Sequence, residues 1–398
     1  MFLLTFAEII LLLLTLASIV FYLLGALATY HFFRILDVTK TDFTPPLSLM
    51  IPVCGLDAGA WENWMSFVEQ DYPNYEILFG VRDVDDPAIE VIKQLIEKFP
   101  EKVRLYKGLA PLGANHKDSI LNYLLAQAKH EYLVFADSDI QVTSDYLQTI
   151  ISPLCDPKVG LVTCAFMGRN PQSLEAAIAS FGRCFDFIPS ALIAKVIDGA
   201  VRFAVGATLV TRASVLADAG GLQFNRIGSD YNLGKRIAEA GYQIKLSHYI
   251  LESDTGDETL WEMITREVRW ARTIRFNRGR QYYGMVICFG TVYCLLLLLM
   301  SGGVQWAIAL TLLTWLIRYF QVIIILICVK APKLTSWLWS LPLRDFLSLG
   351  IWLWGAFGQQ VFWRGRYLKI EGDGIIQEQA DGYTKDVKIN SVNKAQIK

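Results

Sequence analysis

The sequence predicts an α/β domain with a parallel, doubly wound sheet, flanked by apolar segments near the two ends of the chain. Hydrophobic residues make up 53% of the 398 residues and charged residues only 19%, and the apolar excess lies near the termini. Between Pro45 and Tyr282, strand-like apolar runs alternate with helix-like stretches. The net charge of -1 gives no global basic field, so we expect no nucleic-acid partner.

The N-terminal segment has the composition of a membrane anchor. Phe2–Tyr30 is almost continuously apolar, with one acid at Glu8. A membrane-spanning helix needs about 20 such residues, and the basic start of a cleaved signal peptide is missing. We therefore expect residues 1–33 to be a retained transmembrane anchor. Positive charge follows at Arg34 and Lys40, which predicts that the next domain faces the cytoplasm.

Residues 45–256 contain runs with the lengths of strands and helices, which predict one domain. The predicted strands are Leu47–Cys54, Tyr75–Val81, Val103–Tyr106, Tyr132–Ala136, Val159–Cys164, Phe203–Val210 and Tyr242–Ser247. The predicted helices are Ala60–Gln70, Pro87–Phe99 and Lys117–Ala128. Continuous apolar strands are typical of a sheet covered on both faces. The β–α–β–α order predicts parallel pairing, with ligands at the carboxyl ends of the strands.

Two acidic motifs directly follow predicted strands. Asp137-Ser138-Asp139 comes after Tyr132–Ala136, so two carboxylates leave a buried strand together. Mg²⁺ and Mn²⁺ prefer carboxylate oxygens combined with substrate phosphates, and such a metal would neutralise a diphosphate. A helix-capping turn is the alternative. Asp83 follows Tyr75–Val81, where a solvated turn before a helix is equally open.

A third acid, Asp230, precedes the predicted helix Leu233–Ala240. The functional interpretation is a general base that takes a proton from an acceptor hydroxyl. The alternative is again a helix N-cap.

Residues 257–282 are predicted to form an amphipathic helix at the membrane interface. Thr259-x-x-Glu262 resembles a capping box. Arginines recur at every third position, namely Arg266, Arg269, Arg272, Arg275 and Arg278. This spacing sweeps round a helix, so they cannot all face one ligand. We expect most to form a solvated basic face, with some meeting lipid headgroups and others meeting phosphate.

Residues 285–362 are predicted to hold two to three transmembrane or re-entrant segments. Met285–Met300 and Val304–Val329 have the apolar length of spans, and Arg318 within the second is expected to face protein or to snorkel. Phe346–Phe362 is short and contains glycines and glutamines, so we expect it to be re-entrant or interfacial. The tail after Ile370, and hence residues 371–398, is polar and predicted to be disordered.

The ordered set of motifs resembles the family of ceramide glucosyltransferases, which includes bacterial hopanoid-biosynthesis glycosyltransferases. The motifs that carry this resemblance are Cys54-Gly55-Leu56-Asp57, Glu69-Gln70-Asp71-Tyr72-Pro73, Phe79-Gly80-Val81-Arg82-Asp83, Gly113-Ala114-Asn115-His116-Lys117, Ala136-Asp137-Ser138-Asp139-Ile140, Gly160-Leu161-Val162-Thr163-Cys164, Gly206-Ala207-Thr208, Gly220-Gly221, Asp230-Tyr231 and Arg266-x-x-Arg269-Trp270. Each motif alone is weak, whereas the ordered series is specific. It covers roughly Pro45 to Arg280.

The resemblance implies a GT-A fold for residues 45–256 and an inverting glycosyltransferase that uses a UDP-sugar. On the donor side it implies that Asp83 lies near the nucleotide and Lys117 near the phosphates. Asp137 and Asp139 would bind a divalent metal, Mn²⁺ or Mg²⁺, and Asp137 would also bind the diphosphate. The full Asp-Ser-Asp differs from some eukaryotic members and is nearer to the bacterial ones.

On the acceptor side the resemblance implies that Asp230 is the catalytic base. Arg266, Arg269 and Trp270 would hold the diphosphate and close the acceptor side. The implied acceptor is a membrane lipid hydroxyl, and the implied location is an integral membrane protein with its catalytic domain towards the cytoplasm.

Several alternatives stay open from the sequence. Glucose and N-acetylglucosamine, and ceramide, a hopanoid polyol or diacylglycerol, are not separated by any residue. A processive polysaccharide synthase shares these aspartates but usually carries more spans, and transfer to a polyprenyl phosphate is another enzyme reaction. A different class is an inactive lipid- or nucleotide-binding membrane protein. The complete acid set argues against it, and the few spans argue against a transporter.

Overall fold

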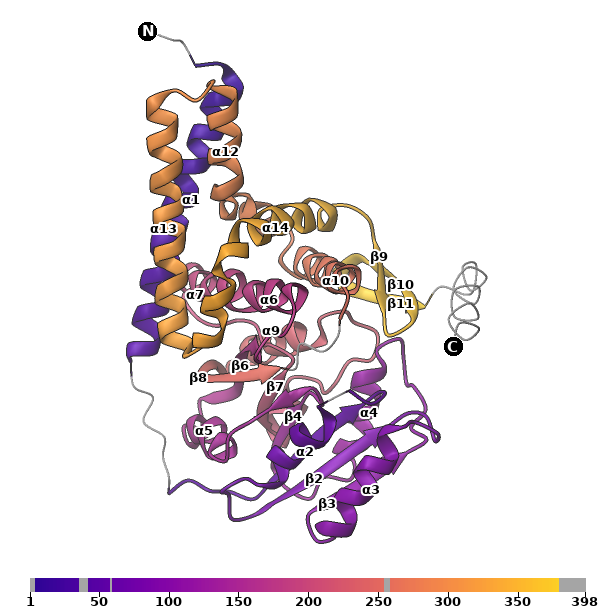
Figure 1. Ribbon diagram of the computed structural model, residues 1–398. Coiled ribbons are helices and arrows are strands. Elements are labelled where there is room, and N and C mark those ends of the chain that lie inside the picture. Colours follow the sequence, from indigo (N-terminus) through magenta and orange to yellow (C-terminus); the bar gives the residue numbers. More distant parts are fainter. Residues whose placement is uncertain (1–3, 36–41, 58, 254–257, 379–398) are drawn as a thin grey trace, which may run out of the picture.

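The computed structural model describes residues 4–35, 42–57, 59–253 and 258–378. A bundle of helices stands at one end of the molecule, and an α/β domain forms the other end (Figure 1). These helices are α1 (Phe6–Arg34), α12 (Gly290–Met300) and α13 (Gln305–Val329). Between the three-helix bundle and the sheet lie α6 (Leu174–Phe181), α7 (Ile188–Ile197), α10 (Leu260–Arg278) and α14 (Leu341–Gly355) (Figure 1).

Three helical stretches among the described residues are long and apolar enough to cross a membrane: α1, α13 and Leu174–Ile197. A bent pair, Gln281–Cys288 with Gly290–Met300, forms a fourth candidate with a 60° break. The most apolar part of Leu174–Ile197 is 78% buried inside the protein, against 39% for α1 and for α13. We therefore assign Leu174–Ile197, which the sequence analysis did not single out, to the interior of the α/β domain.

The sheet has eight strands in the order β3-β2-β1-β4-β7-β6-β8-β5. The strands are β1 (Leu47–Val53), β2 (Tyr75–Val81), β3 (Val103–Lys107), β4 (Tyr132–Ala136), β5 (Ile140–Gln141), β6 (Val159–Gly168), β7 (Thr208–Arg212) and β8 (Gln243–Ser253). The helices around it are α2 (Ala60–Val68), α3 (Ala88–Lys98), α4 (His116–Leu125), α5 (Tyr146–Ile151), α8 (Ala213–Asp218) and α9 (Ser229–Glu239). Two apolar cores, one around Trp64 and Phe79 and one around Phe135 and Phe185, pack these helices onto the sheet.

The predicted parallel pairing is confirmed for β3-β2-β1-β4 and for β6-β8, but the sheet as a whole is mixed. β7 runs antiparallel to both β4 and β6, and β5 runs antiparallel to β8. The reason lies in the connection between β6 and β7. That connection contains α6 and α7 and starts and ends at the carboxyl edge of β6, so β7 returns in the opposite direction. As a result, the start of β7 lies beside the end of β4, and the Asp137 backbone N–H donates to the carbonyl of Ala207 (3.1 Å).

A small three-stranded sheet follows the last helix. Its strands are β9 (Gln360–Trp363), β10 (Arg366–Glu371) and β11 (Ile375–Glu378), paired antiparallel in the order β11-β10-β9. The expectation of disorder beyond Ile370 is therefore wrong for β11. Leu368, Ile370 and Ile376 are buried and pack against Ile227 of the α/β domain. Residues 379–398 lie outside the described residues.

Short helical turns complete the chain. They are η1 (Ser152–Cys155), the π-helical turn η2 (Gly182–Phe187), α11 (Gln281–Gly284), η3 (Met285–Cys288), η4 (Pro332–Ser340) and η5 (Gly372–Gly374).

A buried ionic network joins the three-helix bundle to the α/β domain. Arg318 of α13 binds Asp345 of α14 (2.7 Å) and Asp186 of η2 (2.9 Å). Arg344 of α14 binds Asp186 (2.9 Å) and Glu267 of α10 (2.7 Å). Arg318 thus faces protein, one of the two environments predicted for it. The network fixes α10 relative to the bundle.

Candidate active site

Asp137 and Asp139 lie at the carboxyl end of β4, as the sequence predicts. The Lys117 ammonium at the start of α4 donates to the Asp137 carboxylate and to the Gly206 carbonyl (3.0 Å). Burial raises the pKa of Asp139 to about 6, and the negative charges of Asp137 and Asp57 add to this rise. Carboxylates that lie close together in this way stabilise a bound cation.

The carboxylates of Asp137 and Asp139 can be compared with the ligands that the implied divalent metal requires. In the described part of the chain, no three His, Cys, Asp or Glu side chains come close enough to hold an ion. Two neighbouring carboxylates fit a hard cation such as Mg²⁺, which is usually bound by one or two carboxylates together with substrate phosphates and water. The donor set of Asp137 and Asp139 is therefore adequate for a metal that arrives with a diphosphate.

Asp230 occupies the first turn of α9 and reaches the same edge of the sheet. A Cβ atom added to Gly206 would lie 2.8 Å from the Asp230 carboxylate, so glycine allows their close approach. Burial raises the pKa of Asp230, while the Lys117 charge opposes the rise and Asp137 adds to it. The fold thus gathers Asp230, Lys117 and Asp137, which are far apart in sequence, at one point.

Helix α10 carries the predicted Arg266-x-x-Arg269-Trp270 motif. The capping box at its start is confirmed, with reciprocal hydrogen bonds between Thr259 and Glu262. The Arg266 guanidinium pairs with Glu258 and lies over the Trp270 ring, 5.0 Å from its centroid. The ring of Trp270 meets Phe166 edge-on at 6.1 Å.

Arg269 lies on the side of α10 that faces the acids. Its guanidinium stands over the Trp363 ring of β9, 5.3 Å from the centroid. Burial and the Arg266 charge lower the pKa of Arg269 to about 10, and the Asp230 and Asp137 charges oppose this effect. Arg269 therefore remains a cation at neutral pH, close enough to both acids to interact with them.

The remaining arginines of α10 have structural partners, so the expectation of a mostly solvated basic face is wrong. Arg272 donates to the Phe357 carbonyl (3.1 Å), and Arg275 donates to the Ala356 and Gly358 carbonyls. Arg278 pairs with Asp198 (2.6 Å). Arg272 and Arg275 thus hold the segment between α14 and β9, and Arg278 holds the end of α7; neither contact can be inferred from the spacing of the arginines.

Asp83 lies apart from the gathered acids. Its exposed carboxylate pairs with Arg82 (2.7 Å), and the charged groups that act on it are Arg82 and His116. Arg82 in turn contacts His116 (3.0 Å), which also contacts Arg366 of β10 (2.9 Å). Asp83 therefore belongs to the side of the site that the small sheet covers.

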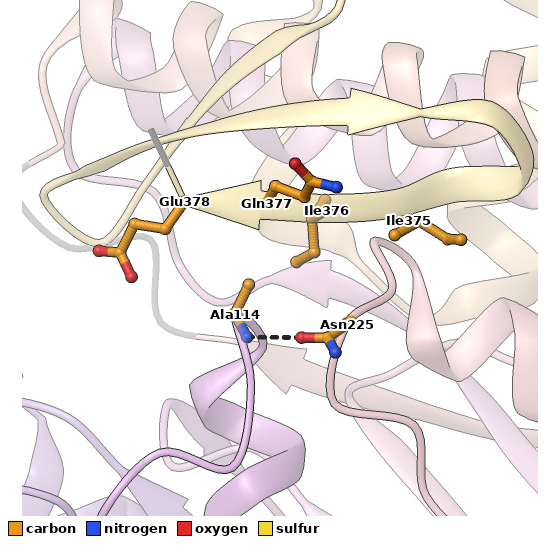
Figure 2. A pocket seen from close by; sticks show the side chains of 6 residues that line it. All are labelled: Ala114, Asn225, Ile375, Ile376, Gln377 and Glu378. Carbon is orange, nitrogen blue, oxygen red and sulfur yellow. Dashed lines mark hydrogen bonds between the residues drawn. The ribbon is translucent and has the colours of Figure 1, made fainter. Parts of the chain in front are cut away.

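The small sheet is the part of the site that the sequence analysis missed. Arg364, in the turn between β9 and β10, donates to the Cys54 carbonyl at the end of β1 (3.4 Å). Beside β11, a cavity of about 350 Å³ is lined by Ala114, Asn225 and residues 375–378. In Figure 2, Ala114 and Asn225 face each other below β11, joined by a hydrogen bond of 2.9 Å. Asp137, Asp139 and Asp230 are not among the residues that line this cavity.

The sequence of the chain is similar to those of known glycosyltransferases. A family model for glycosyl transferase family 21 matches residues 10–376. Ceramide glucosyltransferase 3 of Caenorhabditis elegans is 25% identical over 269 residues, which make up 63% of this chain and 56% of that protein. Ceramide glucosyltransferase 1 of Caenorhabditis elegans is 23% identical over 378 residues, 90% of this chain and 79% of that protein.

A solved structure confirms the predicted fold. A mannosyltransferase from Pyrobaculum calidifontis, in complex with GDP-Man and Mn²⁺, superposes with a TM-score of 0.53 at 16% identity. The match covers 87% of this chain and 99% of that one. The α/β domain therefore has a GT-A-like architecture, with a mixed sheet in place of the expected parallel one.

Proposed function

Because the chain belongs to glycosyl transferase family 21, we propose that it transfers a sugar from a UDP-sugar to the hydroxyl of a membrane lipid, with inversion at the anomeric carbon. The observation that carries the proposal is the gathering of Asp230, Lys117, Asp137 and Arg269 at one edge of the sheet. This arrangement supplies a base and two cations, which are the groups that a direct displacement requires.

In the proposed reaction, Asp230 accepts the proton of the acceptor hydroxyl as its oxygen attacks the anomeric carbon. The bond from that carbon to the diphosphate breaks on the opposite face. Lys117 and Arg269 then stabilise the charge of the departing diphosphate, an electrostatic contribution that is often the largest in catalysis. When bound by Asp137 and Asp139, a divalent cation supplies further neutralisation of that charge. The Mn²⁺ and GDP-Man of the Pyrobaculum calidifontis mannosyltransferase support this role by analogy of fold.

The ceramide glucosyltransferases among the relatives support a ceramide-type lipid and glucose as first candidates. N-acetylglucosamine with a hopanoid polyol remains the alternative pair.

A transfer assay on membranes that contain the protein tests the proposal. We expect radiolabel from UDP-glucose or UDP-N-acetylglucosamine to enter the lipid extract when Mn²⁺ or Mg²⁺ is present. Chelation by excess EDTA should abolish the transfer, and added Mn²⁺ should restore it. Full activity in EDTA would remove Asp137 and Asp139 as metal ligands, and label that enters a polymer would favour a polysaccharide synthase.

We further propose that α1, the bent pair ending in α12, and α13 cross the membrane, with the α/β domain in the cytoplasm. Helix α14 has 15 residues and spans about 22 Å, which is less than the roughly 30 Å of a hydrocarbon core. The strands that follow it pack on the α/β domain, so α14 begins and ends on one side. Arg364, Arg366 and Lys369 then lie in the cytoplasm, in agreement with the positive-inside rule.

Reporter fusions in a bacterial host check this topology. Green fluorescent protein attached after Lys398 should fluoresce, because it stays in the cytoplasm. Alkaline phosphatase inserted after Gly302, in the turn between α12 and α13, should be active, because that turn lies outside. Active phosphatase after Lys398 instead would mean that α14 crosses the membrane.

A further inference from the structure

Arg183 is a buried cation for which the proposed reaction has so far no role. It lies in the π-helical turn η2 between α6 and α7 and is only 5% exposed. Its Nη1 donates to the Ser253 hydroxyl (3.3 Å), and its guanidinium lies over the Phe166 ring. Its Nε has no hydrogen-bond partner among the described residues. A buried donor without a partner is costly, and π-helical turns often occur at functional sites.

Arg266 has the same property and is linked to Arg183 through two aromatic rings: Arg183 lies over Phe166, Phe166 meets Trp270 edge-on, and Arg266 lies over Trp270. Its Nη1 is paired with Glu258, whereas its Nε and Nη2 are buried and have no partner in the described part of the chain. Burial lowers the pKa of Arg183 to about 10. Among the charged groups around it, Arg266 lowers this pKa the most, and Asp139 raises it. Two guanidinium groups from separate helical segments thus present unpaired nitrogen donors next to a predicted metal ligand.

The acids near this pair do not use up its donors. Glu267 is engaged by both of its oxygens with Arg344 (2.7 and 3.0 Å). Glu258 accepts a hydrogen bond from the Nη1 of Arg266, which leaves the Nε and Nη2 of Arg266 without a partner among the described residues. Two buried cations repel each other, and an anion between them would remove both the repulsion and the unpaired donors. The planar fork of a guanidinium matches the oxygens of a phosphate.

We propose that Arg183 and Arg266 form a phosphate-binding subsite on the Asp139 side of the active site. The proposal rests on the proposed function, because it names the part of the substrate that this side binds. Lys117 and Arg269 approach the same phosphates from the Asp137 and Asp230 side. Two sources offer this chemistry: the diphosphate of the sugar donor, and a phosphate on the acceptor lipid.

Binding measurements on the purified full-length protein in detergent test the subsite without relying on transfer. The probes are UDP and uridine, titrated calorimetrically into the wild type and into Arg183→Gln and Arg183→Lys. If the subsite holds the donor diphosphate, Arg183→Gln should weaken UDP binding about 10- to 100-fold, because charge-assisted hydrogen bonds are lost. Uridine binding should be unchanged, and Arg183→Lys should fall between the wild type and Arg183→Gln.

If the subsite holds a lipid phosphate instead, UDP binding should be unchanged. The KM of a phosphorylated acceptor, polyprenyl phosphate, should then rise about 10-fold in Arg183→Gln. Unchanged UDP binding together with unchanged acceptor KM would overturn the subsite, as would an equal loss of UDP and uridine binding. Arg202→Gln, at an exposed arginine, is the matched control and should bind UDP as the wild type does.

Failure of the proposed function gives a different pattern. A wild type that binds UDP but transfers sugar to no lipid would overturn the transferase proposal, while the loss of UDP binding in Arg183→Gln would still support the subsite. If Arg183→Gln does not fold, Arg266→Gln removes the other half of the pair and is expected to produce the same selective loss.

Discussion

Replacement of Asp230 by asparagine is expected to lower kcat by about 10²- to 10⁴-fold, the usual contribution of a general base. The amide cannot accept the proton of the acceptor hydroxyl, while its shape preserves the packing against Gly206. Binding of the nucleotide diphosphate should be largely intact, because Lys117 and Arg269 are unchanged. The measurement is kcat of sugar transfer, together with the Kd of UDP.

Asp118 offers a matched control for this variant. It lies next to Lys117, is buried, and burial raises its pKa to about 7. Asp118→Asn should keep most of kcat, since this carboxyl is directed to Ser229 rather than to the site of displacement. Wild-type turnover in Asp230→Asn would remove Asp230 as the base, and an equal loss in both variants would indicate a structural effect.

The pH dependence follows from the same residue. Asp230 must be ionised to act as a base, and burial raises its pKa above that of an ordinary aspartate. Transfer by the wild type should therefore fall as the pH decreases through this raised pKa, and the acidic limb should lie at a higher pH than for a solvated carboxylate. At saturating Mn²⁺, which keeps the Asp139 carboxylate ionised although burial raises its pKa to about 6, the limb should persist in Asp118→Asn and be absent from the residual activity of Asp230→Asn.

Local signals in the sequence were sufficient for many of the elements. β2 and β4 begin and end at the predicted residues, because each is a largely apolar run bounded by polar residues, with Glu76 of β2 as the one charged residue inside. The start of α10 was set by its capping box. The direction of β7 was not predictable in this way, because it depends on the edge of the sheet at which the long connection from β6 returns. Its predicted start at Phe203 was also too early, since the strand begins at Thr208.

The candidate site shows the same division. Asp137, Asp139 and Asp230 could be proposed because each follows or precedes a recognisable element, and the fold does bring them to one edge. Arg183 gave no signal, because it is an isolated arginine inside the largely apolar stretch Leu174–Ile197, and its unpaired Nε becomes visible only in three dimensions. In the small sheet, β11 was missed because a run of four residues in a polar region resembles a tail, and β9 was missed because it overlaps the end of the segment Phe346–Phe362, which was expected to be re-entrant or interfacial.

The largest expected loss of stability comes from breaking the buried ionic network at Arg318. Arg318→Met removes the cation shared by Asp345 and Asp186 and leaves at least one buried carboxylate without sufficient compensation. Removing one partner of a buried ion pair costs about 3–5 kcal/mol. The change should appear in denaturant titrations of the protein in detergent micelles.

The double variant Arg318→Met/Asp345→Leu separates the loss of a partner from the loss of the pair. It should recover part of the stability, because an apolar pair of similar volume replaces the ion pair with less uncompensated charge. Lys93→Met is the control, since Lys93 pairs with Glu90 on an exposed helix surface and should contribute almost nothing to stability.

If Arg318→Met is as stable as the wild type, the network does not hold the bundle to the domain. If only the single variant loses stability, and its kcat falls in parallel, then the position of α10 depends on the network through Asp186, Arg344 and Glu267.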